Sequence, residues 1–167
     1  FARLKAAAKE PAIITFICTH NSRRSHLGAV WAQTAAAFYD VPGVKTYSGG
    51  TEATACNIRT VRALRRAGFS VVQTKEGTNP EYLIQYSEGA EPQRAFSKIY
   101  NQGGNPTSNY LAVMTCAQAD KNCPVVAGSS GRVAIPYDDP KSADGTPAEE
   151  ATYDERCKQI AREMLYV

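Results

Sequence analysis

The chain has 167 residues, of which 43% are hydrophobic and 21% are charged, and its formal net charge at pH 7 is +3. This composition is ordinary for a globular protein, so disorder is not the expected state, and the charge is much smaller than that of a typical nucleic-acid-binding domain. The longest apolar run, residues 12–18, is too short to cross a bilayer. We therefore expect one domain over residues 1–167, located in the cytoplasm, with neither nucleic acid nor membrane as a partner.

The order of the predicted elements favours an α/β domain with a parallel sheet. Apolar residues spaced three and four apart predict helices that begin near Leu27, at Asn57 and at Thr146, and the last two residues suit the N-cap position. Strands that alternate with helices are typical of a parallel sheet. Four apolar segments predict its strands: 12–18, 44–48, 110–115 and 132–135.

The segment 77–109 does not follow this alternation. Residues 82–86 and 94–100 are strand-like, and they flank a turn-rich stretch at 87–92. We predict a hairpin-like insertion that projects from the sheet. A lid, a partner surface and a loop without function are all compatible with the pattern.

The residues from Cys18 to Arg24 form a Cys-x5-Arg motif between a predicted strand and a predicted helix. A loop at a helix N-terminus points backbone N–H groups at one spot and binds anions. The same field favours a thiolate at Cys18, and Arg24 can offer a planar fork to two oxygens. Ser25 can donate to the sulfur and Asn21 can hold the loop. The alternative is a buried structural cysteine beside a surface arginine.

Two further groups are expected at the same edge of the sheet, because ligands bind beyond the carboxyl ends of parallel strands. Asp138-Asp139-Pro140 follows the last predicted strand, and Asp139 can supply the proton that a leaving oxygen needs. An Asp-Pro pair is also a common turn element. Cys116 follows the third predicted strand, so Cys18, Cys116 and Asp139 should converge.

The five cysteines are odd in number and widely spaced, which favours free thiols in a reducing compartment over a disulfide framework. Cys116 and Cys123 are seven residues apart, roughly 10 Å along a helix, so they can be two buried thiols or a redox pair that joins when the helix unwinds. The spacing does not favour zinc. Cys56 and Cys157 fall beside or on inner helix faces, and we interpret them as packing residues.

Residues 16–25 resemble the signature of the low-molecular-weight protein tyrosine phosphatase superfamily, and most closely that of its thioredoxin-coupled arsenate reductases. The resemblance extends to residues 47–53, the Cys116/Cys123 pair, residues 137–140 and residues 145–150. It implies a small three-layer fold with a four-stranded parallel sheet. The insertion around 77–109 lies outside it.

The resemblance also implies roles for single residues. Cys18 would attack the oxyanion, Arg24 and the loop would hold it, and Asp139 would be the general acid. With arsenate, Cys116 would attack Cys18 and Cys123 would then attack Cys116, leaving a disulfide for thioredoxin. No cofactor and no metal are expected. The oxyanion-binding residues implied are Thr19, His20, Asn21, Ser22, Arg23, Arg24 and Ser25.

Several residues depart from the family pattern. His20 replaces a glycine, Arg23 stands in place of a spare cysteine, and Ala29 replaces an acidic residue that is associated with potassium in some relatives, so we expect no potassium site. We interpret His20 and His26 as rim or surface residues and not as metal ligands. The arginines at 59, 62, 65 and 66 form a stripe that we interpret as a solvated helix face and not as a nucleic-acid site.

Three functions remain open from the sequence. The cysteine pair favours an arsenate reductase, which would act on arsenate with thioredoxin as its reductant. The alternative is a phosphatase that hydrolyses phosphotyrosine or other aryl phosphates through a phosphocysteine. A non-catalytic oxyanion-binding module is the third and is disfavoured by the intact set of Cys18, Arg24 and Asp139.

Overall fold

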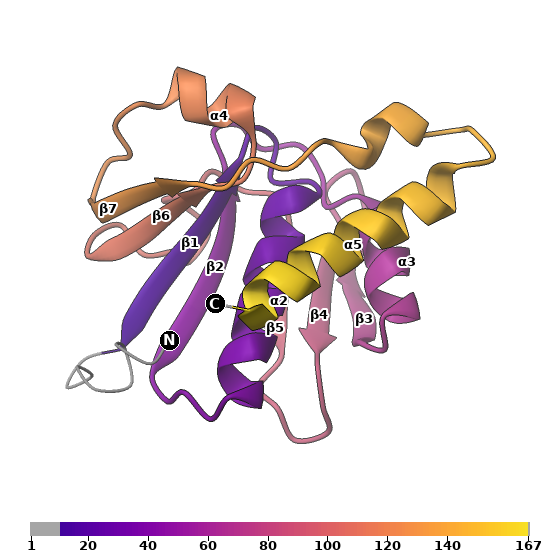
Figure 1. Ribbon diagram of the computed structural model, residues 1–167, viewed down its shortest axis with the longest axis horizontal. Helices are drawn as coiled ribbons and strands as arrows, with labels where there is room; N and C mark the ends of the chain where they lie inside the picture. The colour runs from indigo at the N-terminus through magenta and orange to yellow at the C-terminus, as the bar shows by residue number, and fades with distance from the viewer. Residues whose placement is uncertain (1–10, 167) are drawn as a thin grey trace.

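The structure, a computed structural model, describes residues 11–166 and contains a four-stranded parallel sheet in the order β2-β1-β6-β7 (Figure 1). All three pairs of neighbouring strands run parallel, which confirms the predicted α/β class. The predicted strands correspond to four observed ones: β1 (Ala12–Cys18), β2 (Val44–Gly50), β6 (Tyr110–Met114) and β7 (Ser129–Ala134).

Three longer helices lie together against the sheet: α2 (Arg24–Phe38), α3 (Ile58–Arg66) and α5 (Glu149–Tyr166). Helix α2 packs against β1, β2 and α5, and Figure 1 shows α5 crossing α2 in this view. The short helix α4 (Ala117–Asn122) follows β6, and the 3-10 helix η1 (Pro140–Ala143) precedes α5. No helix within residues 11–166 is both long and apolar enough to cross a membrane.

The predicted caps are present. The Asn57 side chain accepts a hydrogen bond from the Arg59 N–H at 2.9 Å. The Thr146 hydroxyl accepts from the Ala148 N–H at 3.2 Å, and the Glu149 carboxylate accepts from the Gly145 N–H at 2.7 Å. Both helix starts therefore follow from local sequence, because these side chains satisfy N–H groups that have no partner inside the helix.

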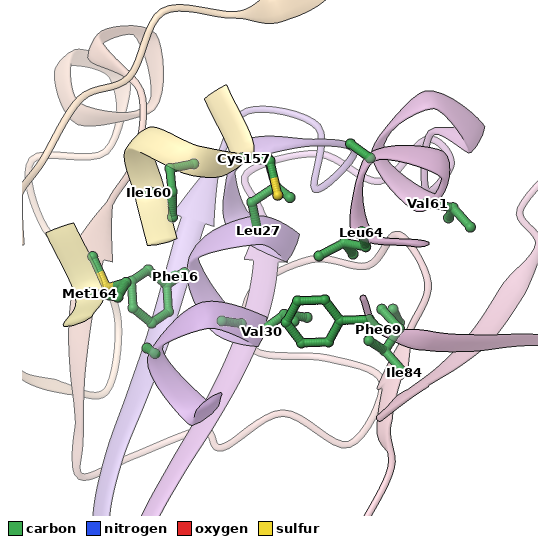
Figure 2. Close-up of a cluster of buried hydrophobic side chains, with 14 of the residues drawn as sticks. Phe16, Leu27, Val30, Val61, Leu64, Phe69, Ile84, Cys157, Ile160 and Met164 are labelled. Atoms are coloured by element: carbon green, nitrogen blue, oxygen red, sulfur yellow. The ribbon is translucent and has the colours of Figure 1, made fainter. Parts of the chain in front are cut away.

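The main core lies between the sheet and the three longer helices (Figure 2). Phe16 of β1 meets α2 closely, since a Cβ added at Gly28 would lie 2.5 Å from the Phe16 ring. The opposite face of the sheet is covered by a second cluster that includes Ile17, Tyr110 and Met114. Side chains are therefore buried on both faces of the sheet, which explains the nearly continuous apolar sequence of β1.

A second, antiparallel sheet contains β3 (Ser70–Lys75), β4 (Glu81–Gln85) and β5 (Gln93–Ala95) in that order. The predicted hairpin is present as the β4–β5 pair, but β3 was not predicted and the second strand ends at Ala95 and not at residue 100. Tyr82 and Ile84 alternate inward and are buried in the main core. The segment therefore packs against the helices and does not project from the domain.

Gly49 allows the chain after β5 to pass directly over β2. A Cβ added at Gly49 would lie 2.2 Å from the Cα of Tyr100, a backbone atom that cannot move aside without shifting its segment. The same segment is tied to β2 by hydrogen bonds from Gly50 N–H to the Lys98 carbonyl and from Tyr100 N–H to the Gly50 carbonyl, both 2.9 Å. Residues 96–100 are thus held against the end of β2.

We predict that Gly49→Ala lowers the free energy of unfolding by about 1–3 kcal/mol through this overpacking. Gly131→Ala in β7 is the matched control, because its nearest neighbour would be the Leu111 side chain at an ordinary 3.4 Å, and we expect a change within about 0.5 kcal/mol. Urea unfolding of the two variants makes the measurement. Equal losses would contradict the steric explanation.

Candidate active site: the loop between β1 and α2

Residues 19–23 form a tight loop at the N-terminus of α2. Among residues 11–166, no acceptor receives a hydrogen bond from the backbone N–H groups of this loop. Carbonyls here are engaged instead: the Thr19 carbonyl accepts from Glu52 N–H at 2.8 Å, and that of the preceding Cys18 accepts from Thr51 N–H at 3.1 Å. The loop therefore offers several free donors beside the positive end of a helix dipole, an arrangement that suits a bound anion.

Asn21 fixes the shape of this loop. Its φ is +45°, in the left-handed region that asparagine tolerates better than most residues. The fully buried side chain donates to the Ser25 hydroxyl at 2.9 Å and accepts from the Lys98 N–H at 3.0 Å. The predicted loop-holding role of Asn21 matches this geometry.

Ser25 lies 3.1 Å from the sulfur of Cys18, measured from Oγ to Sγ. Since the Ser25 oxygen already accepts from Asn21, its own proton is available for the sulfur. Both residues are buried, Cys18 at 3% exposure and Ser25 at 0%. A hydrogen bond to a thiolate is strongest in such a place, because little water competes for it.

Arg24 and Asp139 form an ion pair at the same edge of the sheet. Arg24 Nη2 lies 2.8 Å from Asp139 Oδ2, and Nη1 donates to the Tyr137 carbonyl at 3.0 Å. The Nε of Arg24 is buried and has no partner in the described part of the chain. The Nε edge of the guanidinium thus retains a free N–H donor. Asp139 also caps η1 by accepting from Lys141 N–H at 3.1 Å.

Three other loop residues make contacts that the sequence did not indicate. Arg23 is 8% exposed, and its Nε donates to the Tyr153 hydroxyl at 2.8 Å, so its side chain ties the loop to α5. His20 is half-exposed, and its Nε2 lies 3.7 Å from a Glu52 oxygen. The Ser22 carbonyl accepts from Asn57 N–H.

Cys116 lies beside this loop. Its sulfur is 3.4 Å from the Thr19 hydroxyl oxygen, and it also accepts from the Ala119 N–H at 3.3 Å as the N-cap of α4. Parallel pairing of β1 with β6 brings it there, since Thr115 N–H donates to the Ile17 carbonyl at 2.7 Å. Cys116 is 1% exposed.

Cys123 terminates α4 at the end opposite Cys116 and is partly exposed. Its thiol donates to the Val125 carbonyl at 3.3 Å. The six-residue helix between the two cysteines keeps them roughly 10 Å apart along its axis. A disulfide between them requires the helix to unwind.

Residues of the segment 77–109 support the loop, and sequence reasoning did not find them. The Ser97 hydroxyl donates to the His20 carbonyl at 2.8 Å. The Asn79 side chain holds the Ser97 backbone through two bonds, 2.8 Å to its carbonyl and 3.0 Å from its N–H. Together with the Lys98 N–H on Asn21, these contacts join the second sheet to the loop. No motif in the sequence signals them.

The histidine that follows the loop is not a surface residue. His26 is 1% exposed, and its Nδ1 lies 3.0 Å from the Ser48 hydroxyl. Burial, and secondly the nearby Lys98 charge, lower the pKa of His26 from 6.5 to about 3. The expectation of a rim or surface role was wrong for this residue, because its place in the first turn of α2 turns it inward.

The buried neutral His26 predicts a loss of stability in acid. Between about pH 6.5 and pH 3 the unfolded chain binds one proton at this residue that the folded chain does not. The free energy of unfolding should therefore fall by about 1.4 kcal/mol per pH unit from this group as the pH drops. In urea titrations over this range, the slope of the free energy of unfolding against pH should be smaller by about one proton in His26→Gln than in the wild-type chain. His20→Gln, at a half-exposed histidine, is the control. An unchanged slope in His26→Gln would contradict the assignment.

The remaining predicted residues have structural partners. Cys56 and Cys157 are buried, and Cys157 accepts from the Trp31 indole at 3.3 Å. On the arginine stripe, Arg59 pairs with Glu149 at 2.7 Å and Arg66 with Asp154 at 2.7 Å. These guanidinium groups are neutralised within the protein.

Comparison with known proteins was made in sequence and in structure. No family model matches the sequence. The chain is 27% identical over 137 residues to an arsenate reductase of Halalkalibacterium halodurans, covering 82% of this chain and 80% of that protein. It is 29% identical over 150 residues to an arsenate reductase of Bacillus subtilis, covering 89% and 88% of the two chains.

Solved structures show the same fold at lower identity. A low-molecular-weight phosphotyrosine phosphatase from Vibrio cholerae O395 aligns with a TM-score of 0.59 and 9% identity, over 93% of this chain and 92% of that one. An arsenate reductase in the phosphate-binding state aligns with a TM-score of 0.54 and 15% identity, over 92% and 93%. The chain is thus similar in sequence to arsenate reductases, and its fold is that of the low-molecular-weight protein tyrosine phosphatases.

Proposed function

We propose that this enzyme reduces arsenate to arsenite, with Cys18 as the nucleophile and Cys116 and Cys123 as a disulfide relay. The observation that carries the proposal is the position of Cys116, whose sulfur lies 3.4 Å from the hydroxyl of Thr19, the residue next to Cys18. A second thiol beside the nucleophile serves a redox reaction, and hydrolysis has no use for it. The sequence similarity to arsenate reductases supports the same activity.

The first step binds and activates the anion. The free N–H groups of residues 19–23 and the Arg24 guanidinium hold arsenate, and the Cys18 thiolate attacks arsenic. An S–As bond forms, an As–O bond breaks, and the oxygen leaves as water after protonation. Asp139, which lies 2.8 Å from Arg24, would supply that proton in its protonated form.

The second step transfers the electrons. Cys116 attacks the sulfur of Cys18, a disulfide forms, and the electron pair of the S–As bond goes to arsenic, which leaves as arsenite. Arsenic gains two electrons and the two sulfurs lose them. Cys123 then attacks Cys116 and frees Cys18, and a dithiol reductant such as thioredoxin reduces the Cys116–Cys123 disulfide. The short helix α4 must open for this exchange, since it separates the two thiols.

We expect arsenate turnover, measured as NADPH oxidation with thioredoxin and thioredoxin reductase, to require all three relay cysteines. Cys18→Ser, Cys116→Ser and Cys123→Ser should each lose activity by about 10³-fold or more, because each removes an atom that forms a bond. Cys157→Ser is the matched control: it lies in the core and should retain turnover. Turnover that survives in Cys116→Ser would refute the relay, and a Cys18 inert to alkylation would favour a non-catalytic oxyanion-binding module.

A phosphatase is the second candidate, and the position of Asp139 favours it. Asp139 lies within hydrogen-bond reach of Arg24, and its protonated carboxylic acid form can supply a proton to a leaving phenolate. The Cys18 loop would form a phosphocysteine that water then hydrolyses. This activity needs neither Cys116 nor Cys123, so the two reactions can be distinguished on the same variants.

For aryl phosphate hydrolysis we predict that Asp139→Asn lowers kcat by about 10²–10⁴-fold, since an amide cannot supply the proton. The adjacent Asp138→Asn is the control, because the Asp138 side chain is 97% exposed and bonds only at long range to Arg156. Steady-state rates with an activated and an unactivated aryl leaving group make the measurement. Equal rates in Asp139→Asn and wild type with the poor leaving group would exclude Asp139 as the acid.

A further inference from the structure

A pocket of about 570 Å³ lies between β2, α2 and residues 86–105. Neither Cys18 nor Arg24 lines it, so it is separate from the candidate active site. Its volume falls in the range of small-molecule sites. Its lining includes the side chains of His26, Tyr47, Phe96 and Lys98.

Lys98 is the unusual residue of this pocket. The residue is only 7% exposed, yet within residues 11–166 its ammonium group has no ion pair and donates a single long hydrogen bond, 3.4 Å, to the Phe96 carbonyl. It also lies 4.5 Å from the centroid of the Phe96 ring. An ammonium group carries three donors, and a buried charge without a partner is costly. Within the described residues, two of the three ammonium donors of Lys98 therefore have no acceptor, and its charge has no ion-pair partner.

The other charges around the pocket do not neutralise Lys98. Arg94 lies 4.7 Å from the same Phe96 ring, but its guanidinium is already paired with Glu81 through two bonds of 2.6 Å. Lys45 and Glu91 are exposed lining residues of opposite sign. His26 is neutral, since its pKa is lowered to about 3. The pocket thus retains an uncompensated positive charge at Lys98.

We infer that this pocket binds a small carboxylate or phosphate anion through the Lys98 ammonium group, independently of the Cys18 loop. The anion would supply the counter-charge that Lys98 lacks, and a buried ion pair in a semi-enclosed pocket is stronger than one on the surface. The pocket is large enough for a small organic anion. The bound molecule would lie beside the residue whose backbone N–H holds Asn21.

The pKa of Lys98 fits this assignment. Burial lowers it from 10.5 to about 8, so at neutral pH the group is still mostly charged. A bound anion should raise that pKa, because it favours the protonated form.

The test is a titration of the ¹⁵N-labelled full chain with citrate and, separately, with inorganic phosphate, followed by amide NMR. Phosphate should also shift the amides of residues 19–25, whereas binding to this pocket shifts those of Phe96, Gly103, Gly104 and Asn105. We expect saturable shifts of the pocket amides with at least one of the two probes. Lys98→Met, which keeps the backbone N–H on Asn21, should weaken this binding more than tenfold. Lys45→Met on the rim of the same pocket should change it less than threefold.

Pocket amides that do not respond to either probe in the wild-type chain would overturn the inference. So would equal binding by Lys98→Met and wild type. If Lys98→Met does not fold, as judged from its amide spectrum, the ¹³C-labelled wild-type chain provides the test. Its Lys98 ¹³Cε resonance should report a pKa that rises when citrate or phosphate is added. An unchanged Lys98 pKa with both probes would refute the site.

Discussion

The side chain of Asn21 connects the three segments that form the candidate active site. It reaches Ser25 in the first turn of α2 and the backbone of Lys98 beyond β5, while Ser25 reaches the Cys18 sulfur at the end of β1. The backbone of Asn21 has a positive φ, and two buried hydrogen bonds offset the cost of that conformation. Within residues 11–166, no acceptor receives a hydrogen bond from the backbone N–H groups of this loop, which leaves them available for an anion.

The loop is also held from outside by the second sheet. Ser97 and Asn79 form a chain of hydrogen bonds that ends on the His20 carbonyl. Gly50 lets β2 come close to the loop, since a Cβ there would lie 2.7 Å from Asn21 N and from the Thr19 carbonyl. A site that must hold a tetrahedral anion benefits from such support, because its donors keep their geometry when no ligand is bound. The segment 77–109 is therefore part of the scaffold of the loop.

One loop serves both reactions considered for this enzyme, and the difference lies in the neighbouring thiols. Cys116 caps the first turn of α4, and Cys123 ends the same helix. Six residues are too few for a helix to be stable alone, so α4 depends on its packing through Ala119 against the sheet. In the proposed relay, the bond from Cys116 to Cys18 would draw Cys116 toward the loop and open this short helix. The same thiols would be idle in a phosphatase cycle.

Local sequence determined the elements that depend on local interactions. The apolar run of β1, the Asn57 cap and the Thr146–Glu149 start of α5 are present as predicted, because a continuous apolar run is typical of a strand in a parallel sheet and helix capping involves neighbouring residues. The Cys18–Arg24 motif and the strand ends also predicted that Cys18, Cys116 and Asp139 approach one edge of the sheet.

Only the tertiary structure decided the contacts between segments far apart in the chain. The bond from Lys98 to Asn21 spans 77 positions and the one from Arg23 to Tyr153 spans 130. The inward position of His26 and the unpaired charge of Lys98 are equally invisible in the sequence, because burial depends on what packs around a residue and not on its neighbours in the chain.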